Sequence, residues 1–141
     1  RSSDMQWGWA ALLISGLINI LQSGIGLSMF LPAAKAGAEF APLTGTLLAG
    51  SFLFYNLAKA ILGLAALIFG LALFRNRNAI GRAVGVLSML AGVIAMALNI
   101  AAVHLGLGSV PFSGASGSVA TLLAGCAIWL AASRSERLST R

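Results

Sequence analysis

Charged side chains are scarce in this sequence. They account for 9% of its 141 residues, whereas about a quarter of the residues of a typical soluble domain are charged. Only three of them are acidic, and none of the three lies within a long apolar run. The scarcity excludes an ordinary soluble surface, and the missing carboxylates leave no acid–base pair inside the apolar segments.

Histidine and cysteine are almost absent as well, since His104 and Cys126 are the single examples of each. An internal disulfide needs two cysteines, and a metal or haem site needs several clustered ligands. The chain also lacks a glycine-rich phosphate loop with its lysine and the nucleophile motif of serine hydrolases. We therefore predict that the protein is not an enzyme and that it holds no metal and no cofactor.

Apolar residues are abundant instead: 59% of the chain is hydrophobic, and its mean hydropathy is +0.95. They form four runs, at residues 6–31, 47–74, 83–107 and about 115–132. A helix rises about 1.5 Å per residue, so the first three runs can each cross a hydrocarbon core about 30 Å thick. The fourth is clearly apolar only from Val119, and it is long enough if residues 114–118 join it. The sequence predicts an all-α integral membrane protein, a single transmembrane domain (1–141) of four transmembrane helices.

Polar and helix-breaking residues mark the connections between these runs. We expect Pro32 to end the first helix and a loop of about fifteen residues to follow, because proline disrupts a helix interior. Residues 75–78 predict a tight polar turn. Residues 108–118 are rich in glycine and serine and predict a flexible exposed loop. The first run is too long for the apolar core of a signal peptide, so we expect an uncleaved span.

The basic residues predict the orientation in the membrane. Lys35 is the single basic residue of the first connection, and the third connection has none. Six arginines flank the second connection or follow the fourth run: Arg75, Arg77, Arg82, Arg134, Arg137 and Arg141. Because basic residues concentrate in cytoplasmic loops, both termini are expected in the cytoplasm. Arginine far outnumbers lysine in this Ala/Gly-rich chain, which favours a bacterial cytoplasmic membrane.

Small and polar residues recur at steps of three and four along three of the runs. Helices in lipid pack through such residues, and this spacing is that of left-handed packing. The stripes are Gly8, Leu12, Ser15, Asn19, Gln22 and Gly26; Ala49, Phe52, Asn56, Lys59, Gly63, Ala66 and Gly70; and Gly85, Ser88, Gly92, Ala95, Asn99, Ala102 and Gly106. They predict the interior of a left-handed, up-down four-helix bundle.

Two pairs of short segments resemble each other across the chain. The segment around Asn19 resembles that around Asn99, and residues 46–50 recur as residues 121–125. Two interpretations stay open: a duplicated helical hairpin, or a chance match within apolar sequence.

Polar side chains of three runs share one depth in the predicted membrane. At about 1.5 Å per residue, the deepest of them lie roughly 20–28 Å from the arginine-bearing side, in the outer third of the bilayer. We predict that they form a polar layer with a candidate ligand-binding role. Its members are Lys59, Asn56, Tyr55, Asn19, Gln22, Asn99 and His104.

Lys59 is the most unusual member, because a charge inside a membrane span is unfavourable and usually marks function. Three interpretations compete. The ammonium reaches the outer headgroups; it is paired by Asn19, Asn99 or Glu39 as structural support; or it receives an anionic group from a lipid, a fatty acid or a partner protein. For the other amides, hydrogen bonds between helices are the simpler alternative, as headgroup contact is for His104.

These features predict a non-enzymatic membrane protein, an accessory or regulatory subunit of a larger membrane complex. The alternative is a transporter or a protein that binds lipids or hydrophobic anions at the layer around Lys59. The expected partners are membrane lipids and another integral membrane protein or a second copy of this chain. Nucleic acid is not expected, because the arginines flank apolar runs and so encode topology.

Overall fold

The computed structural model describes residues 2–75 and 78–139, with side chains described between Ser3 and Ser133. In this part of the chain every regular element is helical. Four helical segments are long and apolar enough to cross a membrane: Ser3–Lys35, Ala38–Phe74, Ala79–Leu105 and Leu107–Ser133. The prediction of an all-helical protein with four membrane-spanning helices is confirmed at this level.

The first span is longer than predicted. It consists of α1 (Ser2–Ile25), a π-helical turn η1 (Gly26–Phe30) and α2 (Leu31–Lys35). The prediction that Pro32 ends the first helix is wrong. Pro32 lies inside one continuous helical span, directly after the π-helical turn η1, and a local π-helical turn is one way in which a membrane helix accommodates the hydrogen bond that proline cannot form.

The connection that follows is also shorter than the predicted loop. The chain reverses at Gly37, whose φ of 111° is readily adopted only by glycine, and a 3₁₀ turn η2 (Ala38–Phe40) leads directly into α3 (Ala41–Phe74). Pro42 lies in the first turn of α3, a position that favours proline.

The second half of the chain forms another hairpin. The Asn78 side chain caps α4 (Ala79–Leu105) by accepting a hydrogen bond from the backbone N–H of Ile80. Gly106, with φ 73°, ends α4, and the 3₁₀ turn η3 (Leu107–Ser109) leads into α5 (Val110–Ser139).

The predicted flexible loop over residues 108–118 is wrong, because α5 begins at Val110. The serines of this segment donate their hydroxyls to carbonyls of their own chain: Ser113 to Val110, and Ser116 to Ser113. Helical backbone satisfies its own polar groups, which lipid requires, and small side chains allow close helix packing. These two tertiary demands outweigh the turn preference of glycine and serine.

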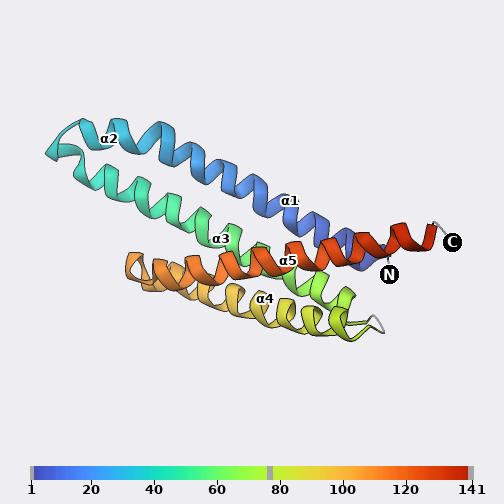
Figure 1. The fold of residues 1–141 in the computed structure, drawn as a ribbon. Coiled ribbons are helices and arrows are strands. Elements are labelled where there is room, and N and C mark those ends of the chain that lie inside the picture. Colours follow the sequence, from blue (N-terminus) through green and yellow to red (C-terminus); the bar gives the residue numbers. More distant parts are fainter. Residues whose placement is uncertain (1, 76–77, 140–141) are drawn as a thin grey trace.

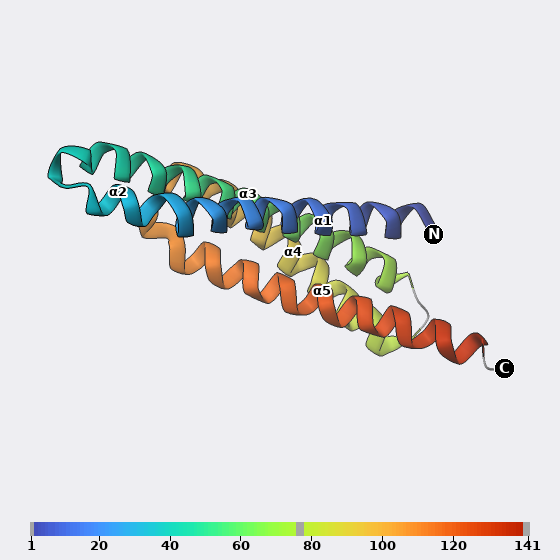
Figure 2. The ribbon, with the colours of Figure 1, turned by 90° about the horizontal axis from the view of Figure 1, so that it is seen from above.

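Helix α3 is the centre of the molecule, because it packs against α1, α4 and α5. Helices α4 and α5 pack against each other, whereas in the described residues α1 makes at most slight contact with either of them. The result is a three-helix core of α3, α4 and α5 with α1 on its flank (Figures 1 and 2).

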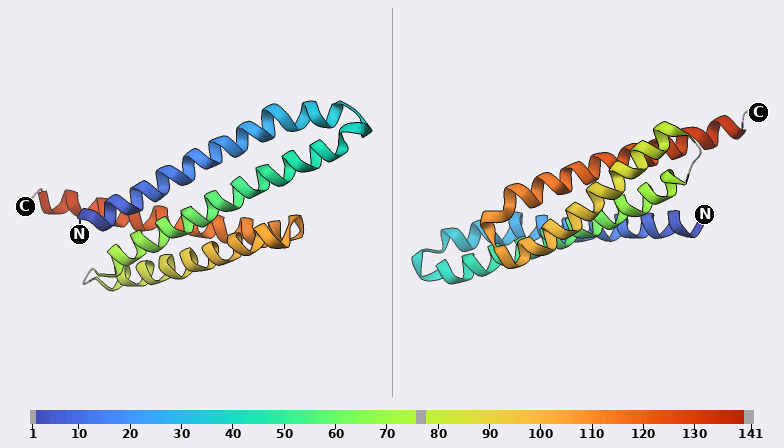
Figure 3. Two further views of the ribbon diagram at one scale, coloured as in Figure 1. Left: turned by 180° about the vertical axis from the view of Figure 1, so that it is seen from behind. Right: turned by 90° about the horizontal axis from the view of Figure 1, so that it is seen from below.

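The two hairpins differ in reach. The tip of the α1–α3 hairpin projects beyond the tip of the α4–α5 hairpin (Figure 3). The start of α1, the end of α3, the start of α4 and the end of α5 lie at the opposite end of the molecule (Figure 1). There Arg75 forms a salt bridge with Asp4 that ties α3 to α1.

Two glycine pairs bring α3 and α4 into backbone contact. A Cβ on Gly63 would lie 2.6 Å from the carbonyl oxygen of Gly92, and one on Gly70 would lie 2.7 Å from that of Gly85. Both pairs belong to the predicted stripes. Most other members of the stripes are buried or half-buried, whereas Ala49 and Gly106 are exposed.

Serine hydroxyls add hydrogen bonds from both sides to the backbone of α3. Ser15 Oγ of α1 donates to the carbonyl of Ala58, and Ser88 Oγ of α4 donates to the carbonyl of Ala66, each at 2.8 Å. The four residues are buried, where such bonds stabilise helix association.

Candidate functional site

The predicted polar layer separates into two groups on different faces of α3. The first group belongs to α1: Gln22 Nε2 donates to Ser51 Oγ of α3 at 3.1 Å, and Asn19 Nδ2 donates to the carbonyl of Ser15 in its own helix at 3.2 Å. Neither amide forms a hydrogen bond with the other predicted site residues among those described. Gln22 therefore links α1 to α3, whereas Asn19 bonds within α1.

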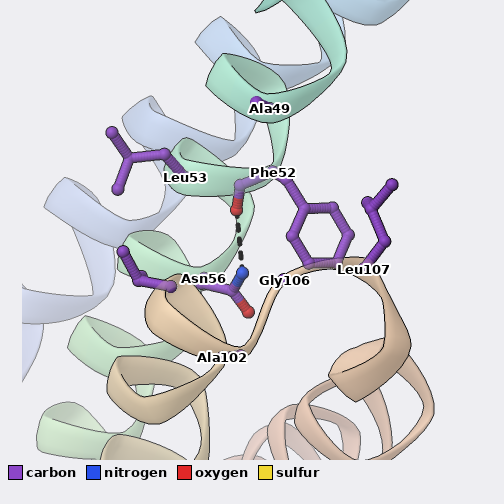
Figure 4. A pocket seen from close by; sticks show the side chains of 8 residues that line it. Ala49, Phe52, Leu53, Asn56, Ala102, Gly106 and Leu107 are labelled. Atoms are coloured by element: carbon purple, nitrogen blue, oxygen red, sulfur yellow. Dashed lines mark hydrogen bonds between the residues drawn. The ribbon is translucent and has the colours of Figure 1, made fainter. Parts of the chain in front are cut away.

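The second group joins α3 to α4 and α5 and contains two fully buried asparagines. Asn56 of α3 donates from Nδ2 to the carbonyl of Phe52 at 2.9 Å, and its amide points toward the end of α4 (Figure 4). Asn99 of α4 donates to the carbonyl of Ala95 at 2.8 Å and to that of Ser113 in α5 at 3.2 Å. Asn99 thus links α4 to α5.

Each buried asparagine leaves its oxygen without a partner. The Oδ1 atoms of Asn56 and Asn99 are inaccessible and accept no hydrogen bond from any described residue. An unpaired buried acceptor typically costs about 1–3 kcal/mol, and lipid offers no water to replace the bond. Such atoms mark places where a donor from outside the chain would stabilise the fold.

Lys59 lies against the N-terminal half of α5. A Cβ on Gly117 would lie 2.7 Å from Lys59 Cδ, and one on Gly114 would lie 3.1 Å from Tyr55 Oη. The absent side chains of these two glycines provide the room that the long side chains of α3 occupy. The Lys59 ammonium lies 5.7 Å from the centre of the Tyr55 ring, one helical turn nearer the start of α3.

The described residues provide no ion partner for Lys59. Its ammonium forms no hydrogen bond or salt bridge with any of them, so neither Asn19, Asn99 nor Glu39 pairs with it. The contact with Tyr55 is a cation–π interaction, which contributes about 0.5–2 kcal/mol. Lys59 is a half-buried residue, and its ammonium keeps all three of its donors free for headgroups or for an anionic ligand.

Two adjoining hollows lie between the N-terminal half of α3 and the C-terminal end of α4. The first, of about 120 Å³, is bounded by Ala49, Phe52, Leu53, Asn56, Ala102, Val103, Gly106 and Leu107 (Figure 4). The second, of about 140 Å³, lies beside Asn56 and Asn99 and is bordered by the exposed His104. The structure thus brings His104 together with the asparagines rather than with Lys59.

Sequence reasoning missed the contribution of α5. Ser113 and Gly114, with Ser116 and Gly117 three residues later, face the polar group because they lie on a helix. The three-residue spacing of these two pairs is the signal that could have identified one helical face.

No family model matches this chain, and searches of curated proteins and of solved structures return no match. The geometry of the site therefore carries the functional interpretation. The candidate site consists of the Lys59 ammonium beside the α3–α5 contact and the amide oxygens of Asn56 and Asn99 beside the α3–α4 contact.

Proposed function

We propose that this protein is a small non-enzymatic membrane protein that binds an anionic lipid headgroup at Lys59. One observation carries the proposal: a lysine within a membrane-spanning helix has no acidic partner among the described residues. Asp4 is paired with Arg75 at the other end of the molecule, and Glu39 forms no ion pair in the described structure.

The depth of Lys59 suits a headgroup. It lies sixteen residues before Arg75, or about 24 Å along α3 at the usual helical rise. Its side chain runs toward the start of α3, as helical side chains tend to. We place its ammonium near the outer boundary of the hydrocarbon, where the low dielectric strengthens its attraction to a phosphate or carboxylate.

Tyr55 adds a second donor to this site. Its hydroxyl forms no hydrogen bond with the described residues and lies beside Gly114, which has no side chain to cover it. An anionic headgroup at this place would meet the ammonium of Lys59 and the hydroxyl of Tyr55 together.

Native mass spectrometry with defined lipids tests the proposal. The protein is given equal amounts of phosphatidylglycerol and phosphatidylcholine in mild detergent, and the bound fraction of each is measured. We expect Lys59→Met to lower phosphatidylglycerol binding at least about tenfold, which corresponds to about 1.4 kcal/mol, and to leave phosphatidylcholine binding unchanged.

Lys35→Met is the matched control, because Lys35 is an exposed lysine at the tip of the α1–α3 hairpin, away from the contact of Lys59 with Gly117. This variant should bind phosphatidylglycerol as the unaltered protein does. Equal binding by Lys59→Met would overturn the proposal and leave Lys59 as a headgroup contact without selectivity.

A role as an accessory subunit is the second candidate, and the position of α1 favours it. In the most apolar window of each span, 11% of the residues are buried in the first span against 50% in the second. Gly16 and Gly24 face open space on α1. A helix of a partner protein, or of a second copy, could pack closely there.

Co-purification in mild detergent tests this second candidate. We expect a stoichiometric companion, or a dimer, that is lost in Gly16→Leu and retained in Gly125→Leu, whose position on α5 is equally open. Retention in both variants would exclude this face of α1 as the contact.

The location and orientation belong to the same proposal. We place the protein in a bacterial cytoplasmic membrane with both termini in the cytoplasm. Arg75 and Arg82 lie near the end of the molecule that holds the termini, and Lys35 lies at the other end, which supports this orientation. The left-handed packing and the duplicated hairpin stay predictions.

A further inference from the structure

The hollow between α3 and α4 is lined by two asparagines whose side-chain oxygens have no donor among the described residues. Asn56 Oδ1 and Asn99 Oδ1 are fully buried and unpaired among the described residues, and both asparagines line the hollow of about 140 Å³. This hollow is separate from the Lys59 contact, which lies between α3 and α5.

The orientation of both amides is determined by their N–H groups. Asn99 Nδ2 has three acceptors within reach: the carbonyls of Ala95 and Ser113 and the hydroxyl of Ser116. Reversing this amide would place its oxygen against two carbonyl oxygens. Reversing Asn56 would likewise oppose the carbonyl of Phe52. The oxygens therefore stay free, and only a hydrogen-bond donor can satisfy them.

The charge of the surroundings narrows the class of donor. Lys59 follows Asn56 by three residues on α3, so a cation bound at the asparagines would be repelled. Two oxygens are also too few for a metal ion that prefers six or more. An anion offers no donor to amide oxygens. An uncharged hydroxyl group meets both requirements, because it donates a hydrogen bond and carries no positive charge.

The walls of the hollow indicate what the hydroxyl is attached to. Apart from the two asparagines and His104, the lining residues are apolar: Leu53, Leu57, Ala60, Ile100 and Val103. Four of these are exposed on the surface that faces lipid: Leu53, Leu57, Ile100 and Val103. A cavity of about 150 Å³ can hold a benzene molecule, so a hydroxymethyl group and several methylenes fit here.

We infer that this hollow binds the uncharged hydroxyl head of a membrane alcohol, which donates to Asn56 or Asn99 while its chain leaves between α3 and α4. The ligand enters sideways from the outer leaflet, past Leu53 and Val103, and the side chains that cover the two oxygens in the described structure move aside to admit its hydroxyl. His104 borders the hollow and can hydrogen-bond to a second hydroxyl of the same head.

Thermal unfolding in a detergent without hydroxyl groups tests this inference. The unaltered protein is titrated with 1-dodecanol and, separately, with dodecyl methyl ether, which has the same chain but no donor. We expect a saturable rise in Tm with the alcohol and no such rise with the ether. This comparison does not depend on the folding of any variant.

Asn56→Leu identifies the site, because it removes one free oxygen and only one hydrogen bond, within its own helix. We expect this variant to lose at least about tenfold in affinity for dodecanol. Asn19→Leu is its matched control, since Asn19 also donates to its own helix and lies on α1. It should respond to dodecanol as the unaltered protein does.

Three results would overturn the inference. An equal rise with the ether would show that only the alkyl chain binds. An equal rise with glycerol would show a site for soluble polyols rather than for a lipid. No rise with dodecanol, or an unchanged affinity in Asn56→Leu, would leave water as the donor to the asparagine oxygens.

Discussion

Gly117 shows how an absent side chain can shape a site. The stem of Lys59 occupies the space where a Cβ of Gly117 would lie, 2.7 Å from Lys59 Cδ. Gly114 makes similar room for Tyr55. Among the described residues, Lys59 is the one charged side chain away from the ends of a span, and its position thus depends on two glycines of another helix.

We predict that Gly117→Val displaces the Lys59 side chain and weakens phosphatidylglycerol binding about tenfold, or about 1.4 kcal/mol. The added side chain cannot share the space of the lysine stem, so the ammonium must move away from Tyr55. Native mass spectrometry with the same lipid pair measures the effect. Gly125→Val makes the same change on the same helix in open space and should bind normally; equal binding by both variants would contradict the prediction.

The identity of the important side chains could be predicted from the sequence, but their contacts could not. A lysine and several amides inside apolar runs can be identified from the sequence alone, because polar residues are rare in such runs. Which amide atom stays unpaired depends on neighbours such as Ser113, which is fourteen residues from Asn99 in the chain. Gln22 resembles Asn56 in the sequence, yet it bonds to Ser51 on another face of α3.

Among the elements, the contact between α3 and α4 is the closest. Gly63 faces Gly92 and Gly70 faces Gly85, and each pair leaves no room for a Cβ. The two glycines of α3 are seven residues apart, and so are the two of α4. The same glycine contact therefore recurs after two helical turns. Close backbone approach of this kind increases van der Waals packing in lipid, where the hydrophobic effect does not drive helices together.

We predict that Gly92→Ala lowers the free energy of unfolding by about 1–3 kcal/mol, because its Cβ would lie 2.5 Å from the carbonyl oxygen of Gly63 and force the helices apart. Unfolding in mixed micelles with increasing sodium dodecyl sulfate measures the change. Gly16→Ala is the control: it faces open space in α1 and should stabilise the protein by about 0.5–1 kcal/mol. A Gly92→Ala protein as stable as the unaltered one would show that α3 and α4 can separate freely.

Helix α5 illustrates how tertiary structure overrides local preference. Residues 110–118 have the composition of a loop, yet they form the first turns of a helix that packs on α3 and α4. Their small side chains are what allow the approach to Tyr55 and Lys59. The same residues that favour a turn in water favour helix contact in a membrane.

At the scale of the whole molecule, the four helices do not surround a common axis evenly. In the core, each of α3, α4 and α5 packs against the other two, whereas α1 packs mainly against α3. The start of α1 and the end of α5 lie at the same end (Figure 1). A chain with an even number of spans has both ends on the same side of the membrane, whichever helices pack against one another.

Cysteine labelling tests the proposed orientation. In a Cys126→Ser background, Ser3→Cys and Gly108→Cys place a thiol at exposed positions at opposite ends of the molecule. We expect a membrane-impermeant thiol reagent to label Gly108→Cys in intact bacterial cells and Ser3→Cys only after the membrane is permeabilised. Permeabilised cells, in which both variants should react, provide the control. Labelling in the reverse order would show that the arginine-rich end faces outward.

The sequence by itself determined that this is a helical protein with four apolar spans, because membrane insertion depends on the length and composition of each run. It also indicated which stripes face inward, since small and polar residues recur with the helical period. Only the tertiary structure decided that α1 flanks the core, that residues 110–118 are helical and that the polar layer divides between two faces of α3. These features arise from contacts between segments distant in the chain, and no single run of sequence contains them.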